Sequence, residues 1–235
     1  MGKKLKISII VIIGVFIIVA GAYVHTNYQA TETATAYLNG TGDVNVTNVT
    51  NGLFLDGPGN DTALIFYPGA KVEYTAYLPM FAQIAKEGID CYLVKMPINF
   101  AFLGIDSADS IINESNYAHY FMCGHSLGGV MAGEYVNHSS KVDGLILICS
   151  YLEKPVNVPV LSIYGSDDTV MNMDNYNKSK SMIVNNFTEF IVAGGNHAHW
   201  GNYGEQSEDS PSHISAEDQQ KQGVDEIIRF IKQWT

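Results

Sequence analysis

The sequence contains one serine in a setting that favours nucleophilic chemistry, within Gly124-His125-Ser126-Leu127-Gly128. An apolar run, 119–123, precedes it, and a segment of helical composition, 127–135, follows it. A sharp turn between a strand and a helix presents a serine hydroxyl to a substrate, and the flanking glycines relieve the crowding of that turn. The pattern predicts that Ser126 attacks a carbonyl carbon.

A serine hydroxyl is a weak nucleophile that needs a base, and the base needs an acid to orient it. In chains with this turn, the acid follows the serine and the histidine comes last. The apolar segment 158–164 ends in Gly165-Ser166-Asp167-Asp168. We expect Asp168 to be the acid, with Asp167 as the alternative.

The base is expected after the last apolar run, 187–192, where the chain continues to His197 and His199. His197 is the favoured base and His199 the alternative. A metal site at these two histidines is the competing interpretation, but no other clustered ligands accompany them. His125 adjoins the serine on a tight turn, so we expect it to pack or bond within the turn rather than act as the base.

Attack on a carbonyl creates an oxyanion, which needs fixed donors. One donor is expected to be the backbone N–H of Leu127, at the start of a helix. The other is assigned to the N–H of Ala70, in the loop 68–73. Five side chains near predicted strand ends are candidates to line the substrate pocket: Glu73, Tyr74, Phe100, Tyr151 and Trp200.

Short apolar runs alternate with helical stretches along the chain, which predicts an α/β fold with a mostly parallel sheet covered by helices on both faces. Ligands of such sheets bind beyond the carboxyl ends of the strands. One or two edge strands are expected over 44–55. Further strands are expected over 63–67, 89–95, 119–123, 145–149, 158–164 and 187–192, and helices over 74–86, 107–112, 127–135, 175–184 and 217–234.

Five ordered motifs lie at 67–73, 95–97, 124–129, 164–168 and 194–204. Together they resemble the small alpha/beta-hydrolase family of the fold-5 type, which is related to dienelactone hydrolase. The resemblance spans about residues 50–235 and implies the alpha/beta-hydrolase fold with a triad of Ser126, Asp168 and His197. Two departures bear on the shape of the pocket: Thr169 stands where members usually have glycine, and the segment 208–212 is more acidic than usual.

The charge and the N-terminus indicate the compartment. Thirteen basic and 24 acidic side chains give a formal net charge of −11, which disfavours nucleic acid as a partner. Three lysines precede the uncharged run 7–24, whose 18 residues would span about 27 Å as a helix. We expect residues 1–25 to be a membrane anchor, or alternatively a cleaved signal, followed by a polar linker (26–43) and a single extracytoplasmic domain (44–235).

These features together predict an extracytoplasmic, single-pass serine hydrolase that cleaves an ester or similar acyl bond. Only residues 151–157 join two predicted strands where a lid would be inserted, so an open site for small or water-soluble substrates is expected. No metal or organic cofactor is needed, and Cys91, Cys123 and Cys149 are expected to be free, buried thiols. The alternatives are an acyltransferase that uses the same triad, and a surface binding module that has lost activity.

Overall fold

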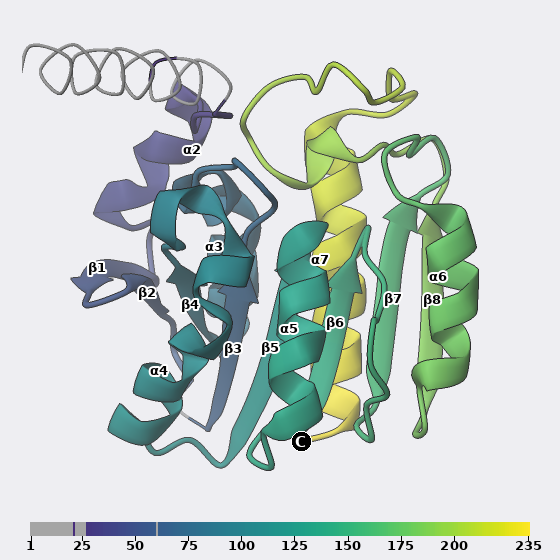
Figure 1. The fold of residues 1–235 in the computed structure, drawn as a ribbon. Helices are drawn as coiled ribbons and strands as arrows, with labels where there is room; N and C mark the ends of the chain where they lie inside the picture. The colour runs from purple at the N-terminus through teal and green to yellow at the C-terminus, as the bar shows by residue number, and fades with distance from the viewer. Residues whose placement is uncertain (1–20, 22–26, 60) are drawn as a thin grey trace, which may run out of the picture.

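The computed structural model describes residues 21, 27–59 and 61–235 of the chain. An eight-stranded sheet runs through the molecule in the order β1-β2-β4-β3-β5-β6-β7-β8 (Figure 1). The pairs from β4 to β8 are parallel, whereas β1 and β2 form an antiparallel edge. The strands are β1 (Asn45–Val49), β2 (Gly52–Asp56), β3 (Thr62–Tyr67), β4 (Asp90–Val94), β5 (His119–His125), β6 (Gly144–Ile148), β7 (Val160–Gly165) and β8 (Phe187–Val192).

The central strands are apolar because both of their faces are covered. Every residue of β3 and of β6 is buried. Helix α3 (Leu78–Lys86) and helix α7 (Ala216–Gln233) share one hydrophobic core with one face of the sheet. Helices α4 (Ala108–Glu114) and α5 (Leu127–His138) share a second core with the other face. The predicted α/β class, with a mostly parallel sheet covered on both faces, is confirmed.

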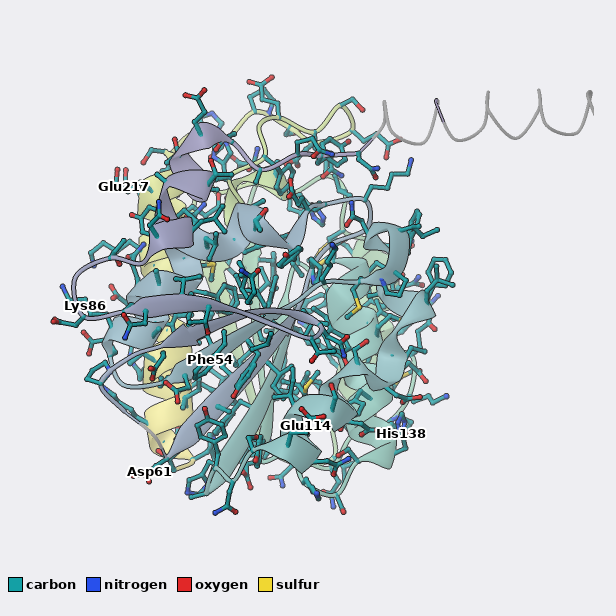
Figure 2. The ribbon with its side chains drawn as sticks, turned by 90° about the vertical axis from the view of Figure 1, so that its left-hand side faces the viewer. Phe54, Asp61, Lys86, Glu114, His138 and Glu217 are labelled. Atoms are coloured by element: carbon teal, nitrogen blue, oxygen red, sulfur yellow. The ribbon has the colours of Figure 1, made fainter. Side chains whose placement is uncertain are left out.

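The antiparallel edge is more exposed than the centre. Four of the five residues of β1 are exposed, in keeping with its alternation of Asn or Thr with Val. In β2, Phe54 stacks on Tyr92 of β4 with ring centroids 4.7 Å apart, and Figure 2 looks at this edge. Of the one or two edge strands expected over 44–55, the structure shows two, which pair as an antiparallel hairpin.

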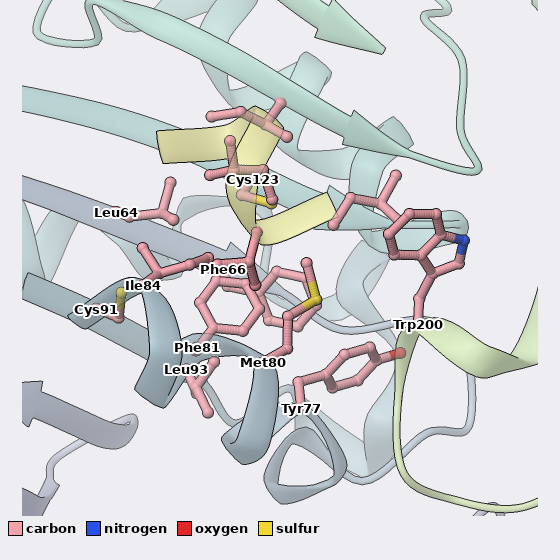
Figure 3. Close-up of a cluster of buried hydrophobic side chains, with 14 of the residues drawn as sticks. Leu64, Phe66, Tyr77, Met80, Phe81, Ile84, Cys91, Leu93, Cys123 and Trp200 are labelled. Atoms are coloured by element: carbon pink, nitrogen blue, oxygen red, sulfur yellow. The ribbon is translucent and has the colours of Figure 1, made fainter. Parts of the chain in front are cut away.

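The first core contains a group of aromatic side chains that contact one another. Phe66 of β3 lies 4.5 Å from Phe81 of α3 and 4.6 Å from Tyr77, measured between ring centroids (Figure 3). Tyr77 ends a 3-10 turn, Tyr74–Tyr77, that leads into α3. Gly88, with φ of 88°, follows that helix where a stop is expected. The three cysteines are free and buried, as predicted.

The segment 27–43 differs from the expected polar linker. It contains the one-turn helix α2 (Glu32–Thr35), in which Ala34 is fully buried. The backbone of Tyr28 bonds to the loop after β3, donating to Lys71 O (2.9 Å) and accepting from Glu73 N (2.9 Å). Tyr28, Ala30 and Tyr37 also pack against the first core, although the mostly polar composition of the segment predicts a linker.

The predicted membrane anchor, 7–24, falls outside the described residues except for Gly21. Among the residues that the structure describes, none of the helices has both the length and the apolar character required to cross a bilayer.

The remaining helix, α6 (Met173–Ser179), lies beside β8 (Figure 1).

Candidate active site

Ser126 occupies the turn between β5 and α5 with φ of 53° and ψ of −125°. A positive φ is strained for a serine, and such strain persists only where the surroundings enforce it. Here the Ser126 N–H donates to Ile148 O (2.9 Å), and Ser150 Oγ donates to Ser126 O (2.7 Å). A Cβ on Gly124 would lie 2.4 Å from the Gly128 backbone, so only glycine fits at that position. The turn predicted from the sequence is therefore present.

The predicted acid and base meet at the same edge of the sheet. Asp168 follows β7 and His197 follows β8, and the His197 Nδ1 lies 2.8 Å from Asp168 Oδ2. Their side chains are only 1% and 2% exposed, respectively, so the pair is shielded from water. The other carboxylate oxygen, Oδ1, accepts from the N–H groups of Val170 (2.8 Å) and Met171 (2.9 Å).

These contacts keep the carboxylate ionised. Burial raises the pKa of Asp168, but the hydrogen bond and the charge of His197 outweigh it and bring that pKa down to about 2. An ionised carboxylate can only accept, so the His197 Nδ1 carries the proton of this hydrogen bond. In the neutral imidazole, the lone pair is then on Nε2, which is the tautomer that a general base requires.

The hydrogen bond between Ser126 and His197 is the one contact of the expected triad that is absent from the described part of the chain. Catalytic hydrogen bonds are often long without substrate and shorten when it binds. The base nevertheless lies near this turn, because the ring of His125, the residue before Ser126, lies 4.6 Å from the ring of His197. Among the described residues, the N–H groups of Ala70 and Leu127 make no hydrogen bond, which leaves both available to an oxyanion.

The alternative acid and base, Asp167 and His199, are not paired with each other in the described part of the chain. The Asp167 carboxylate lies 2.5 Å from Nδ1 of His213, an exposed histidine of a later loop, and the hydrogen bond from His213 lowers the pKa of Asp167. The backbone N–H of His199 donates to the side chain of Asn196 (3.0 Å), but the Nδ1 of its imidazole has no partner among the described residues, so no carboxylate orients it. The geometry thus favours Asp168 and His197 over Asp167 and His199.

His125 bonds within the turn region, as expected. Its Nδ1 lies 2.8 Å from Tyr77 Oη, and its side chain is fully enclosed by protein. Burial, followed by the charge of the nearby His197, holds the pKa of His125 well below its ordinary value. A histidine that stays neutral and is bonded away from Ser126 is not placed to act as its base.

Cys149 belongs to the site, although sequence reasoning treated it only as a buried thiol. It follows β6 with φ of 48°, and its thiol lies close enough to Asp168 to help lower the pKa of that carboxylate, although less than His197 does. Burial, then the charge of Asp168, raises the pKa of Cys149. Its position directly after a predicted strand of a parallel sheet indicates the edge where ligands bind, but it does not indicate that Cys149 lies beside Asp168.

Three side chains of the site could coordinate one metal ion: the ligand atoms of His125, Cys149 and His197 lie within 4.8 Å of one another. However, the two imidazole rings lie one against the other, with centroids 4.6 Å apart and planes 44° apart. The Nδ1 of His197 is held by Asp168. A carboxylate at Nδ1 orients an imidazole equally well for a metal ion, so the packing of the two rings against each other is the observation that favours an oriented base.

The two departures from the family pattern contact each other. Thr169 donates through its hydroxyl to Glu208 O (3.1 Å) and through its N–H to Asp209 Oδ1 (3.5 Å). Asp209 Oδ2 also accepts from the N–H of Ala198 (2.8 Å), the residue after His197. The acidic loop therefore links the loop of the acid to the loop of the base.

The five residues predicted to line the substrate pocket lie in different surroundings. Trp200 is fully buried and belongs to the first core, where it is labelled in Figure 3, so its prediction as a pocket residue is corrected. The turn Ala198–Trp200 after the base directs this side chain inward against Gly223 of α7. Glu73 accepts from the N–H of Ala30 (3.0 Å) and so holds the N-terminal segment.

The other three candidates are partly buried aromatic residues. Tyr74 and Tyr151 pack against the hydrophobic cores. Phe100 lies 5.2 Å from Phe102 between ring centroids. Their part in a substrate pocket stays a prediction.

Among known protein families, a profile described as the Alpha/beta hydrolase family matches residues 63–221. Comparison with curated proteins finds none that matches the chain. Similar solved structures include the alpha/beta hydrolase domain-containing protein 10 from mouse, 13% identical, with a TM-score of 0.59 over 83% of this chain and 100% of that chain.

Two further structures share the fold. A predicted CIB-like hydrolase from Thermoplasma acidophilum is 17% identical, with a TM-score of 0.56 over 79% of this chain and 97% of that chain. DcsB, solved in complex with its substrate analogue, is 12% identical, with a TM-score of 0.62 over 82% of this chain and 100% of that chain. At such low identity these likenesses establish the fold alone.

Proposed function

The chain belongs to the alpha/beta hydrolase family, and from that premise we propose that it is a serine hydrolase that cleaves an ester or similar acyl bond. The observation that carries the proposal is the 2.8 Å contact between His197 Nδ1 and an ionised Asp168. This contact leaves the lone pair of the imidazole on Nε2, beside the turn that holds Ser126.

In the proposed reaction, Ser126 Oγ attacks the acyl carbon while its proton passes to His197 Nε2. The oxyanion that forms accepts hydrogen bonds from the N–H groups of Ala70 and Leu127. The C–O bond to the leaving alcohol then breaks, and the alcohol leaves with the proton from the imidazolium. Water repeats the sequence on the acyl-enzyme: it gives a proton to His197, and the carboxylic acid is released as Ser126 recovers that proton.

The proposed substrate is small or water-soluble. The segment 151–157 connects β6 to β7 by a short route, with Leu152 and Val156 buried in the second core. It does not extend over the site as a lid would. An open site offers little enclosure for a long acyl chain, which favours short acyl groups.

The proposed location is the outer face of the cell membrane. It rests on the lysines that precede the apolar run 7–24, a pattern that places the following domain outside. Retention of the full chain in membranes after alkaline carbonate washing is expected, together with loss of the domain when intact cells are treated with protease. Release of the protein into the medium would favour the cleaved signal instead.

The hydrolase proposal is tested on the full chain in detergent, with a fluorophosphonate probe and a p-nitrophenyl ester of a short acid. Wild-type protein should be labelled and should hydrolyse the ester, and Ser126→Ala should lose both properties while keeping its circular dichroism spectrum. Ser181→Ala, a change at an exposed serine, is the matched control and should behave like the wild type. Equal labelling of wild type and Ser126→Ala would refute the proposal.

A metal-dependent hydrolase is the second candidate, because the ligand atoms of His125, Cys149 and His197 lie within 4.8 Å of one another. The two candidates differ in a direct measurement. A metal-dependent enzyme purifies with about one equivalent of a transition metal and loses activity when that metal is chelated. The proposed serine hydrolase keeps its activity in chelator.

A further inference from the structure

A buried hydrogen-bonded chain connects the loop after β3 with the turn that carries Ser126. The N–H of Gly69 donates to Tyr77 Oη (3.2 Å), and Tyr77 Oη lies 2.8 Å from His125 Nδ1. Gly69 directly precedes Ala70, and His125 directly precedes Ser126. The chain therefore joins the residue before one expected oxyanion donor to the residue before the expected nucleophile.

The direction of the hydrogen bonds follows from burial. Tyr77 is fully buried, which raises the pKa of its phenol and keeps the hydroxyl protonated. The oxygen accepts from Gly69, so its single proton is free to go to His125 Nδ1. Burial lowers the pKa of His125, so its ring is neutral and carries one proton. Because Nδ1 accepts from Tyr77, this proton is on Nε2.

The same chain also reaches the expected base. The His125 ring lies 4.6 Å from the His197 ring, and the Nε2 of His125 has no hydrogen-bond partner among the described residues, so this contact is one of packing. The space around the chain is full: a Cβ on Gly69 would lie 2.9 Å from His125 Nδ1 and 3.2 Å from Tyr77 Oη. A displacement of the Tyr77 or His125 side chain would therefore also displace the loop that contains Gly69 or the ring of His197.

We infer that Tyr77 and His125 are positioning residues for catalysis. Tyr77 holds the N–H of the Pro68–Gly69 peptide, one peptide before the one that carries the Ala70 N–H, and so keeps the Ala70 N–H directed at the developing oxyanion. His125 packs against the ring of His197 and supports its position. This inference rests on the proposed serine hydrolase function and adds two residues that do not touch the reacting atoms. It explains why an uncharged histidine and a tyrosine are buried together beside a site that does not use them as acid or base.

The test compares Tyr77→Phe with Tyr135→Phe in the full chain. Tyr135 is also buried, and its hydroxyl donates to Asp109 Oδ1 (2.8 Å), so its loss costs one comparable hydrogen bond outside the site. Both variants should lose some thermal stability, since each removes a hydrogen bond made by the hydroxyl of a buried tyrosine. Only Tyr77→Phe should lower kcat for the short ester, by about tenfold or more, with KM changed less than about twofold.

A transition-state analogue separates positioning from a merely structural role. A trifluoromethyl ketone binds as an oxyanion, so its inhibition constant should rise for Tyr77→Phe by the same factor as kcat/KM falls. His125→Asn provides a second, independent variant. Its amide oxygen can still accept from Tyr77 at the place of Nδ1, but the ring against His197 is gone, so kcat should fall while the affinity for the ketone stays within about threefold.

The outcomes divide clearly. If Tyr77→Phe keeps the wild-type kcat and ketone affinity, or if Tyr135→Phe loses as much kcat, Tyr77 has no positioning role. If Tyr77→Phe does not fold, His125→Asn decides the role of His125: a wild-type kcat, or a loss of kcat with an equal loss of ketone affinity, would overturn it. If wild-type protein is not labelled at Ser126, the proposed function itself has failed, and the inference with it.

Discussion

Replacing Asp168 by asparagine tests the orientation of the base most directly, because the structure dictates how the new side chain must lie. Two backbone donors, Val170 N–H and Met171 N–H, bind the Oδ1 of Asp168 at 2.8 and 2.9 Å. In Asp168→Asn the amide oxygen must accept these two bonds, since an NH₂ group there would face two donors. The NH₂ group is then forced toward His197.

This placement reverses the tautomer of the base. An NH₂ donor opposite His197 Nδ1 makes that nitrogen an acceptor, which moves the imidazole proton to Nε2, the atom that should take the proton of Ser126. A base that presents a proton instead of a lone pair cannot deprotonate the serine. In serine proteases such a reversal lowers kcat by about 10⁴-fold, which corresponds to about 5 kcal/mol of barrier. We expect a loss of the same order here.

The assay is the initial rate of hydrolysis of a short p-nitrophenyl ester near neutral pH, together with thermal unfolding. Asp167→Asn is the matched control, because Asp167 is the neighbouring carboxylate and bonds to the exposed His213 instead. Its rate should stay within about twofold of wild type, as expected for a surface group. A folded Asp168→Asn that loses less than about tenfold, or an Asp167→Asn that loses more than Asp168→Asn, would refute the reasoning.

Three further predictions follow from described contacts. The pKa of Asp168 is lowered to about 2 in the folded protein from an ordinary 3.8. The ionised carboxylate therefore stabilises the fold by about 2 kcal/mol above about pH 4, and this stabilisation is lost as the pH falls toward 2. In denaturant titrations from pH 5 to pH 2, the free energy of unfolding should fall more steeply for wild type than for Asp168→Asn. Asp209→Ala removes the carboxylate that links the loops of the acid and the base, so it should cost about 1–2 kcal/mol of stability and lower kcat/KM, whereas Glu208→Ala, whose contact with Thr169 uses only the backbone, should change neither. Gly124→Ala would place a Cβ 2.4 Å from backbone atoms, so the variant should melt far below the wild type or fail to fold, and an unchanged melting curve would contradict the geometry of the turn.

The strands and helices could be predicted from the sequence because each apolar run is short and ends at a turn residue or a polar segment. The expected strand over 158–164 corresponds to Val160–Gly165, and the expected helix over 217–234 to Ala216–Gln233. The meeting of Asp168 with His197 followed from the same pattern, since the carboxyl ends of parallel strands share one edge. This edge is shared whatever the order of the strands, so the proximity of Asp168 and His197 could be predicted without that order.

Three features could not be predicted because they depend on contacts distant in sequence. The proximity of Cys149 to Asp168 requires knowing that β6 pairs with β7. The contact of Thr169 with Asp209 joins two loops separated by 40 residues. The inward direction of Trp200 depends on the 3-10 turn that follows His197, which no apolar periodicity indicates.

The docked N-terminal segment has a practical consequence for anyone who shortens this protein. A cut near residue 44, where the sequence places the domain boundary, would remove the backbone bonds of Tyr28 to Lys71 and Glu73. It would also remove the bond from Thr31 N to Asn202 O, in the stretch that follows the base. Such a fragment would retain the whole sheet yet release the loops on both sides of the active site at once, so a soluble version of the enzyme should begin no later than residue 27.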